Sequence, residues 1–310
     1  MINNAMIQKV LKGTASVLLL AFIGFQPAFA APQLRAPQRL WVYGEMQSDH
    51  QTPSLYDNSS LATLDRMNGD LLNKFDFTGG SILTFKPSQT ELEVGKYFAT
   101  YNFNENGRSN LLVNIASSNS TYFENPRVLY MYTSGIVKFD IASPNSYTQK
   151  TLMEFNDLNV RPAGLLGGTV RIVKTNSKLF FPVRPLIDNY NNSLLGAMDL
   201  QTNEGSLVYD FGNRTIRDLV AIGNDVYVAV SGLGIQVFRN GEGSPAPFAS
   251  SITDAKTITV DSDGNIYVWN PTSRILFKVS PDESVQELSH DFYDVKQLAI
   301  TTSVAEVLQP

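Results

Sequence analysis

Short apolar runs separated by turn-forming residues dominate the chain from residue 39 onward. The runs are rich in Val, Ile, Tyr, Phe and Thr, and clusters of Gly, Asn, Asp, Ser and Pro stand between them. Almost no window in this part places apolar residues at helical spacing. The pattern is typical of many short antiparallel strands, and it predicts an all-β sandwich, barrel or propeller.

The segment 254–288 contains four such runs, at residues 255–260, 266–269, 274–279 and 284–288. With a turn between each pair, they predict four antiparallel strands, A to D, in one compact unit.

The same order recurs upstream, in residues 218–238 and 111–155. A large aromatic side chain on the second strand returns about every 40–50 residues, a period typical of β-propeller blades. These aromatic positions are Tyr130, Phe180, Tyr227 and Tyr267.

The two ends of the chain supply complementary parts of one unit. Residues 39–43 resemble the second strand at residues 178–181, and no first strand precedes them. Residues 295–300 form a spare strand A that aligns with residues 256–260. Pairing the ends would remove an open sheet edge. The sequence therefore predicts a β-propeller whose first blade combines strand A from the C-terminus with strands B–D from the N-terminus.

The spacing of the units sets the number of blades. Residues 41 to 130 leave room for two units, so one blade is expected within residues 80–110. Its runs at residues 81–85 and 96–103 do not reveal which strand of the unit they form. The prediction is six blades of four strands, with five or seven blades and a two-domain sandwich as alternatives.

Residues 260–268, VDSDGNIYV, carry a resemblance to known proteins. They resemble the strand–turn–strand of six-bladed β-propellers of the NHL-repeat, gluconolactonase-like and TolB-like group. The resemblance is close only over residues 255–279. Elsewhere it is limited to the regular spacing of strands and turns. It implies the fold, with Asp and Gly forming the turn and Tyr packing between blades, and it implies no particular activity.

The first 30 residues have the order of a secretory signal. Lys9 and Lys12 precede an apolar run at residues 17–23, and small residues end at Ala30. The apolar run is shorter than the ~20 residues that cross a bilayer. We predict a signal peptide over residues 1–30 that is cleaved after Ala30.

The rest of the chain is then a leader over residues 31–38 and a single β-propeller domain over residues 39–310. We expect the mature protein in the bacterial periplasm or outside the cell, without membrane insertion after cleavage. The chain has no cysteine, so its stability must come from a core rather than from disulfides.

The composition restricts the chemistry of the chain. Cysteine nucleophiles and Cys/His zinc sites are excluded, and the two histidines are His50 and His290. We place His290 in a solvent-facing loop. Acidic and basic residues are interspersed at a formal net charge of −5, which disfavours nucleic acid as a partner. Asp261 and Asp263 resemble the start of a calcium loop without its later ligands, so they are interpreted as turn formers.

Carboxylates stand near the start of three predicted inner strands, at Asp218, Asp254 and Asp294. Lys256 and Lys296 follow two of them at a distance of two residues. A lysine beside each carboxylate would neutralise it, so ion pairs are favoured over a metal cage. The sequence predicts no metal ligand, no cofactor and no catalytic residue. The active-site motifs of gluconolactonase-like enzymes do not occur at matching positions.

Two connections between strands B and C are long, at residues 45–60 in the first blade and 184–193 in the fourth. These blades stand opposite each other in a six-bladed ring, and all B–C connections emerge on one face. Loops on a rigid scaffold often carry binding residues. The candidate ligand-binding residues are Asp49, His50, Tyr56, Asp57, Arg184, Asp188 and Tyr190.

These features favour an exported, non-catalytic binding or scaffold protein of the bacterial cell envelope, with a protein or a glycan as its ligand. Aromatic and Asn residues concentrated in residues 97–132 leave a carbohydrate- or peptide-contacting surface open. The alternatives are a metal-dependent lactonase- or esterase-type hydrolase on the same fold and a structural subunit of an envelope assembly.

Overall fold

The computed structural model divides the chain into residues 1–36 and residues 37–310. The predicted signal peptide and its cleavage site lie outside the described residues. The structure describes residues 38–49, 60–76, 82–85, 92–96, 99–104, 107–113, 121–125, 128–132, 134–143, 146–163, 171–187 and 193–302.

Strands within the described ranges form six antiparallel sheets. The first contains β25 (Phe292–Thr302), β1 (Gln38–Met46), β2 (Ser60–Leu64) and β3 (Leu71–Asp76). The second contains β4 (Ile82–Phe85), β5 (Leu92–Lys96), β6 (Ala99–Asn104) and β7 (Gly107–Val113). The third contains β8 (Thr121–Asn125), β9 (Val128–Tyr132), β10 (Gly135–Ser143) and β11 (Ser146–Glu154).

The other three sheets follow in chain order. The fourth contains β12 (Val160–Pro162), β13 (Val173–Lys174), β14 (Lys178–Pro185), β15 (Leu194–Asp199) and β16 (Gly205–Asp210). The fifth contains β17 (Ile216–Ile222), β18 (Asp225–Val230), β19 (Gly234–Phe238) and β20 (Ala246–Phe248). The sixth contains β21 (Thr257–Val260), β22 (Ile266–Asn270), β23 (Ile275–Val279) and β24 (Val285–Ser289). Three short 3-10 helices connect described strands: η1 (Gln47–Asp49), η2 (Phe155–Leu158) and η3 (Arg239–Gly241).

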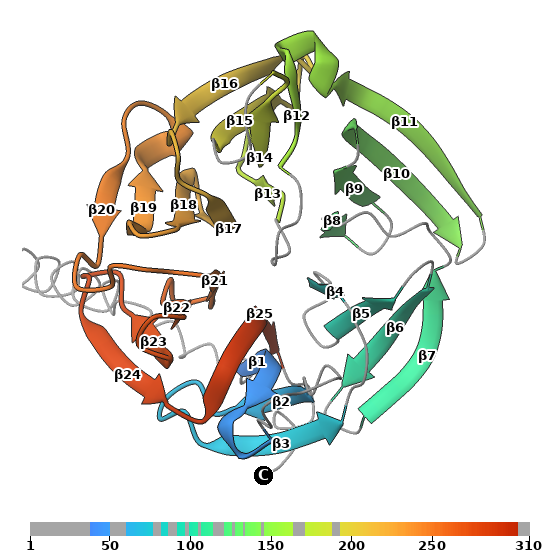
Figure 1. The fold of residues 1–310 in the computed structure, drawn as a ribbon. Helices are drawn as coiled ribbons and strands as arrows, with labels where there is room; N and C mark the ends of the chain where they lie inside the picture. The colour runs from blue at the N-terminus through green and yellow to red at the C-terminus, as the bar shows by residue number, and fades with distance from the viewer. Residues whose placement is uncertain are drawn as a thin grey trace, which may run out of the picture. The chain divides into compact units, whose positions relative to one another are not determined.

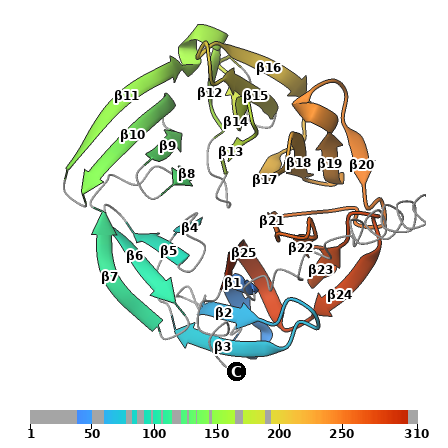
Figure 2. The same ribbon diagram turned by 180° about the vertical axis from the view of Figure 1, so that it is seen from behind.

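The six sheets of residues 38–302 are arranged around a common centre (Figures 1 and 2). The inner strands β25, β4, β8, β13, β17 and β21 lie nearest that centre, and the outer strands lie at the periphery (Figure 1). The chain is therefore an all-β protein with the fold of a six-bladed β-propeller, as the sequence predicts. The blade expected within residues 80–110 is the second sheet, β4 to β7.

One blade boundary differs from the sequence interpretation, which began the third unit at residue 111. Residues 107–113 form β7, the outer strand of the second sheet, and the third sheet begins with β8. The apolar run at residues 111–113 reads like an inner strand, but it pairs with β6 of the preceding blade.

The two ends of the chain pair in one sheet, as predicted. β1 and β25 are antiparallel over the full length of β1, from Gln38 opposite Thr302 to Met46 opposite Phe292. The register shifts next to Gly44, where a Cβ atom would collide with the backbone oxygen of Asp294. Glycine at this position permits the close approach of the two strands.

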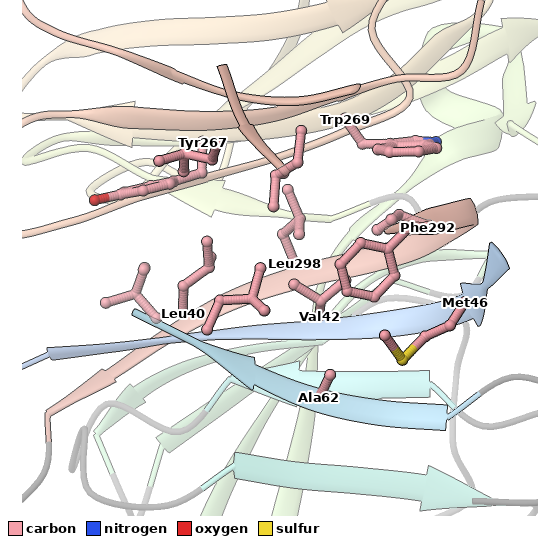
Figure 3. Close-up of a cluster of buried hydrophobic side chains, with 13 residues drawn as sticks. Leu40, Val42, Met46, Ala62, Tyr267, Trp269, Phe292 and Leu298 are labelled. Atoms are coloured by element: carbon pink, nitrogen blue, oxygen red, sulfur yellow. The ribbon is translucent and has the colours of Figure 1, made fainter. Parts of the chain in front are cut away.

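Large flat side chains on the second strands fill the space between neighbouring sheets. Tyr267 and Trp269 of β22 pack against Leu40 and Val42 of β1 and against Phe292 of β25 (Figure 3). Tyr227 packs in the same way against the sixth sheet, Phe180 against the fifth and Tyr130 against the fourth. The repeating aromatic residue of the sequence is therefore an interblade packing residue.

A second contact joins the sixth and first sheets through the turn after β21. Asp261 is buried, and its carboxylate accepts hydrogen bonds from the backbone N–H groups of Asp263 and Asn265. The same carboxylate binds the Tyr267 hydroxyl at 3.0 Å and the Arg66 guanidinium at 2.8 Å. The interpretation of Asp261 as a turn former is confirmed, and the turn also holds the C–D connection of the first sheet.

Asp261 predicts an acid-dependent part of the stability. Burial alone would raise its pKa, but the hydrogen bonds from Asn265 and Tyr267 outweigh burial and lower the pKa below its usual value. The stabilisation is therefore complete above the unfolded pKa of about 3.9 and is lost as the pH falls through the lower folded pKa.

We expect Asp261→Asn to lower the melting temperature at pH 7, with a cost of about 1–3 kcal/mol for the lost charged acceptor. The difference from wild type should stay constant down to about pH 5 and shrink below about pH 4. The control is Asp210→Asn, an exposed carboxylate that accepts one N–H from Gly212. A difference for Asp261→Asn that grows towards low pH would contradict this account.

Candidate functional site

One face of the propeller collects two kinds of connection. Because consecutive strands are antiparallel, the connections between the second and third strands emerge on the same side as those that lead from one sheet to the next. We call this side the loop face. Its described connections are residues 47–49, 134, 155–159, 186–187, 193, 211–215, 231–233, 249–256, 271–274 and 290–291.

The predicted binding loops begin on this face. β1 ends at Met46 and β14 ends at Pro185, and the first and fourth sheets stand opposite each other around the centre (Figure 1). This arrangement agrees with the premise of the loop prediction. The overhang of the two loops above the centre remains a prediction, since most of their residues lie outside the described ranges.

The candidate residues are only partly placed. Asp49 lies in η1 directly after β1. His50, Tyr56, Asp57, Asp188 and Tyr190 lie outside the described residues.

Arg184 is not a loop residue as predicted, because it lies within β14 opposite Arg161 and is 9% exposed. Pro182 looks like the end of that strand in the sequence. Pairing with β12, however, extends the strand to Pro185.

The inner strand of the fourth sheet is interrupted. β12 pairs with one end of β14 and β13 pairs with the other, and no described strand pairs with the middle of β14 on that side. The Tyr132 hydroxyl, from the third sheet, occupies this position. It accepts the N–H of Ala163 at 2.7 Å and donates to the carbonyl of Pro182. Burial raises the pKa of Tyr132, so the phenol keeps the proton that this bridge requires.

Arg171 extends from just before β13 towards the inner strands of two other sheets. Its Nε lies 3.4 Å from Oδ1 of Asp218 on β17, and its Nη2 donates to the carbonyl of Leu298 on β25. One guanidinium thus connects the fourth, fifth and first sheets near the centre of the ring. Sequence reasoning missed Arg171, because its partners are 47 and 127 residues away and no local pattern indicates them.

Asp218 is the most buried charged side chain near the centre, with 1% exposure. Its carboxylate accepts the N–H of Leu219 at 2.9 Å, the N–H of Ile258 at 2.9 Å and the Thr257 hydroxyl at 2.8 Å. Burial raises its pKa, and Arg171 together with the hydrogen bonds acts in the opposite direction. The groups around Asp218 therefore engage both of its oxygens.

Two ion pairs link neighbouring inner strands on the loop face. Arg217 binds Asp254 at 3.0 Å, and Lys256 binds Asp294 at 2.5 and 2.7 Å. The predicted neutralisation of the carboxylates by cations is correct for these residues, but the partners differ from those expected. Each pair joins adjacent sheets: Asp254 and Lys256 lie in the connection before β21, and their partners Arg217 and Asp294 lie on β17 and β25.

The described residues contain no group of three or more His, Cys, Asp or Glu side chains arranged to hold a metal ion. His290 lies on the connection between β24 and β25, where its side chain is exposed and 3.2 Å from Glu287. This agrees with the expected solvent-facing position. Within the described ranges, no helix is long and apolar enough to span a bilayer.

Hydrogen bonds join several connections of the loop face into one surface. Ser193 exchanges backbone hydrogen bonds with residues 211 and 212. The Thr215 carbonyl accepts the N–H of Ser231, and the Thr215 N–H donates to the Ser231 hydroxyl oxygen. Asp254 then accepts the N–H of Gly232 and the hydroxyl of Thr272. From the fourth to the sixth sheet, the loop face is therefore a hydrogen-bonded rim rather than a set of separate loops.

Comparison with known proteins supports the fold. No protein-family model and no curated protein sequence matches the chain. A chain in the crystal structure of a nidogen/laminin complex matches with a TM-score of 0.56 at 10% identity, over 86% of this chain and 99% of that chain. AztD from Citrobacter koseri gives a TM-score of 0.49 at 12% identity, over 86% and 98% of the two chains.

A functionally unknown protein from Desulfotomaculum acetoxidans gives a TM-score of 0.46 at 13% identity, over 79% of this chain and 83% of that chain. At these identities a likeness concerns the fold alone. The nidogen/laminin match agrees with the propeller that the strand pairing defines.

The contacts of Asp218 predict that it couples the fifth and sixth sheets. Asp218→Asn removes one acceptor oxygen and leaves a buried donor unpaired, which costs about 1–3 kcal/mol. Thr257→Val should also destabilise the wild type, but it should cost less in the Asp218→Asn background because the shared hydrogen bond is already lost. Urea unfolding of the four proteins measures this coupling. Strictly additive effects would contradict the role assigned to the carboxylate.

Proposed function

We propose that the protein is an exported, non-catalytic β-propeller of the bacterial cell envelope that binds a macromolecular partner on its loop face. The observation that carries the proposal is the difference between the centre and the rim. Near the centre, the carboxylate of Asp218 is engaged by Arg171 and by the groups around Thr257 and Ile258. On the rim, hydrogen bonds hold the connections of the loop face in place, and solvent-exposed side chains remain on these connections.

Polar groups that are engaged near the centre and a fixed, exposed loop face favour binding of a macromolecule over catalysis on a small substrate. Hydrolytic chemistry needs a general acid or base with access to substrate. Asp218 is buried and its oxygens are occupied by protein groups. A partner protein or glycan needs only a fixed, exposed surface, which a hydrogen-bonded rim on a rigid scaffold supplies.

Export is part of the proposal and rests on the N-terminal sequence. The charged, apolar and small-residue order of residues 1–30 supports cleavage after Ala30. The protein has no cysteine, so its fold does not depend on disulfide formation in an oxidising compartment such as the periplasm. We assign the mature protein to the periplasm or the outside of the cell.

The test expresses the full chain in a Gram-negative host and first measures the N-terminus of the exported protein by mass spectrometry, where Ala31 is expected. Cells are then treated with a cleavable cross-linker, and partners are identified for wild type and two variants. In the first variant Gly-Ser linkers replace residues 50–57 and 188–191. In the matched control a Gly-Ser linker replaces residues 281–283, the turn between β23 and β24 on the opposite face.

We expect the loop-face variant to lose the partner and the control to keep it, while both melt like wild type. Loss of the partner in the control alone would contradict the proposal. Stoichiometric divalent metal in the purified protein, together with lactone hydrolysis, would also contradict it and would favour the enzyme alternative.

A further inference from the structure

Three large apolar side chains on the loop face are exposed although the core of the protein is well packed. Ile187 is 95% exposed, Leu186 is 46% exposed and Leu233 is 40% exposed. Leu186 and Ile187 follow β14 in the fourth sheet, and Leu233 lies between β18 and β19 in the fifth. The three side chains thus share the loop face on two adjacent sheets, and exposed apolar side chains that form a patch are typical of a protein contact surface.

The connection at residues 211–215 forms hydrogen bonds both to the connection that follows β14 and to the connection between β18 and β19. It leads from β16 of the fourth sheet to β17 of the fifth. Gly212 accepts the N–H of Ser193, which ends the connection that carries Leu186 and Ile187. On the other side Thr215 binds Ser231, two residues before Leu233. Residues 211–215 are therefore hydrogen-bonded to both connections that carry the apolar side chains, at Ser193 on one side and at Ser231 on the other. Residues 188–192, between Ile187 and Ser193, lie outside the described ranges.

Arg214, in this connection, is an exposed cation without a counter-ion among the residues that the structure describes. Its Nη1 donates to the carbonyls of Ser231 at 3.3 Å and Gly232 at 2.9 Å. These contacts fix the guanidinium beside Leu233, and no described residue accepts a hydrogen bond from Nε or Nη2. Nearby Arg217 differs, because it is paired with Asp254.

We propose that Leu186, Ile187, Arg214 and Leu233 form a docking surface for a protein segment that presents an apolar side chain next to a carboxylate. The inference rests on the proposed function and specifies the partner as a protein. An arginine fixed through one nitrogen binds a carboxylate in a preferred planar geometry. The formal net charge of the chain is −5, so an isolated cation beside apolar side chains selects an acidic segment locally while the remaining surface repels acidic proteins.

The test uses a phage-displayed library of random dodecapeptides, selected on the purified mature protein. Enriched peptides are synthesised with a fluorophore, and their affinities are measured by anisotropy for wild type, Arg214→Glu and the double variant Ile187→Ser with Leu233→Ser. The matched control is Leu207→Ser, which changes a 48%-exposed side chain on the outer strand β16. The melting temperature of each variant verifies that it folds.

We expect enriched peptides to share an apolar residue within a few positions of Asp or Glu. Arg214→Glu and the double serine variant should each weaken binding by about tenfold or more, and Leu207→Ser should leave it unchanged. Replacing the peptide carboxylate by lysine should restore binding to Arg214→Glu. This charge reversal separates direct contact from a general loss of structure.

Peptides without a carboxylate, equal binding to Arg214→Glu, or an absence of enriched peptides would overturn the inference. Peptides that lose affinity only in the variant with linkers at residues 50–57 and 188–191 would also overturn it while leaving loop-face binding intact. A cross-linked partner that remains bound both to that linker variant and to the double variant Ile187→Ser with Leu233→Ser, in contrast, argues against the proposed function itself.

Discussion

The antiparallel pairing of β1 with β25 is the contact on which the remaining structure depends. It joins residues at opposite ends of the sequence, from Gln38 with Thr302 to Met46 with Phe292. All other sheets lie in the chain between these two strands, so the pairing sets where the series of sheets begins and ends. A shift of one residue would turn Leu298 and Ile300 away from the core they share with Leu40.

Side chains provide the polar contacts that the inner strands do not obtain from sheet pairing. Each inner strand pairs with the second strand of its own sheet, which leaves its other side facing the centre. Asp218 binds the backbone of Ile258, and Lys256 binds Asp294 in the next sheet. Arg171 reaches across to both β17 and β25. Side chains near the centre thus hold the sheets to one another.

The sequence predicts the blades well because the responsible signals are local or periodic. The aromatic residues on the second strands recur with the unit, and the spare strand at residues 295–300 matches the strand missing before residue 39. Predictions failed where a contact depends on the arrangement of sheets. Asp254 is paired by Arg217 of the neighbouring sheet, and Arg184 is enclosed in β14 because β12 extends along it.

The candidate site was predictable only in part. The long connections were visible as polar insertions, and their position on one face follows from strand direction. The role of Arg214 was not visible, because it depends on the carbonyls of Ser231 and Gly232, 17 and 18 residues later. Leu186 and Ile187 lie in the connection predicted at residues 184–193, but only the fold reveals that these side chains and that of Leu233 are exposed.

Disulfide trapping measures the pairing of the two ends most directly, since the chain has no cysteine of its own. Arg39 lies opposite Thr301 in the register, while Thr302 lies opposite Gln38. Oxidation should cross-link Arg39→Cys with Thr301→Cys and should leave Arg39→Cys with Thr302→Cys reduced. Equal cross-linking of both pairs, or cross-linking of neither, would contradict a propeller built on this sheet.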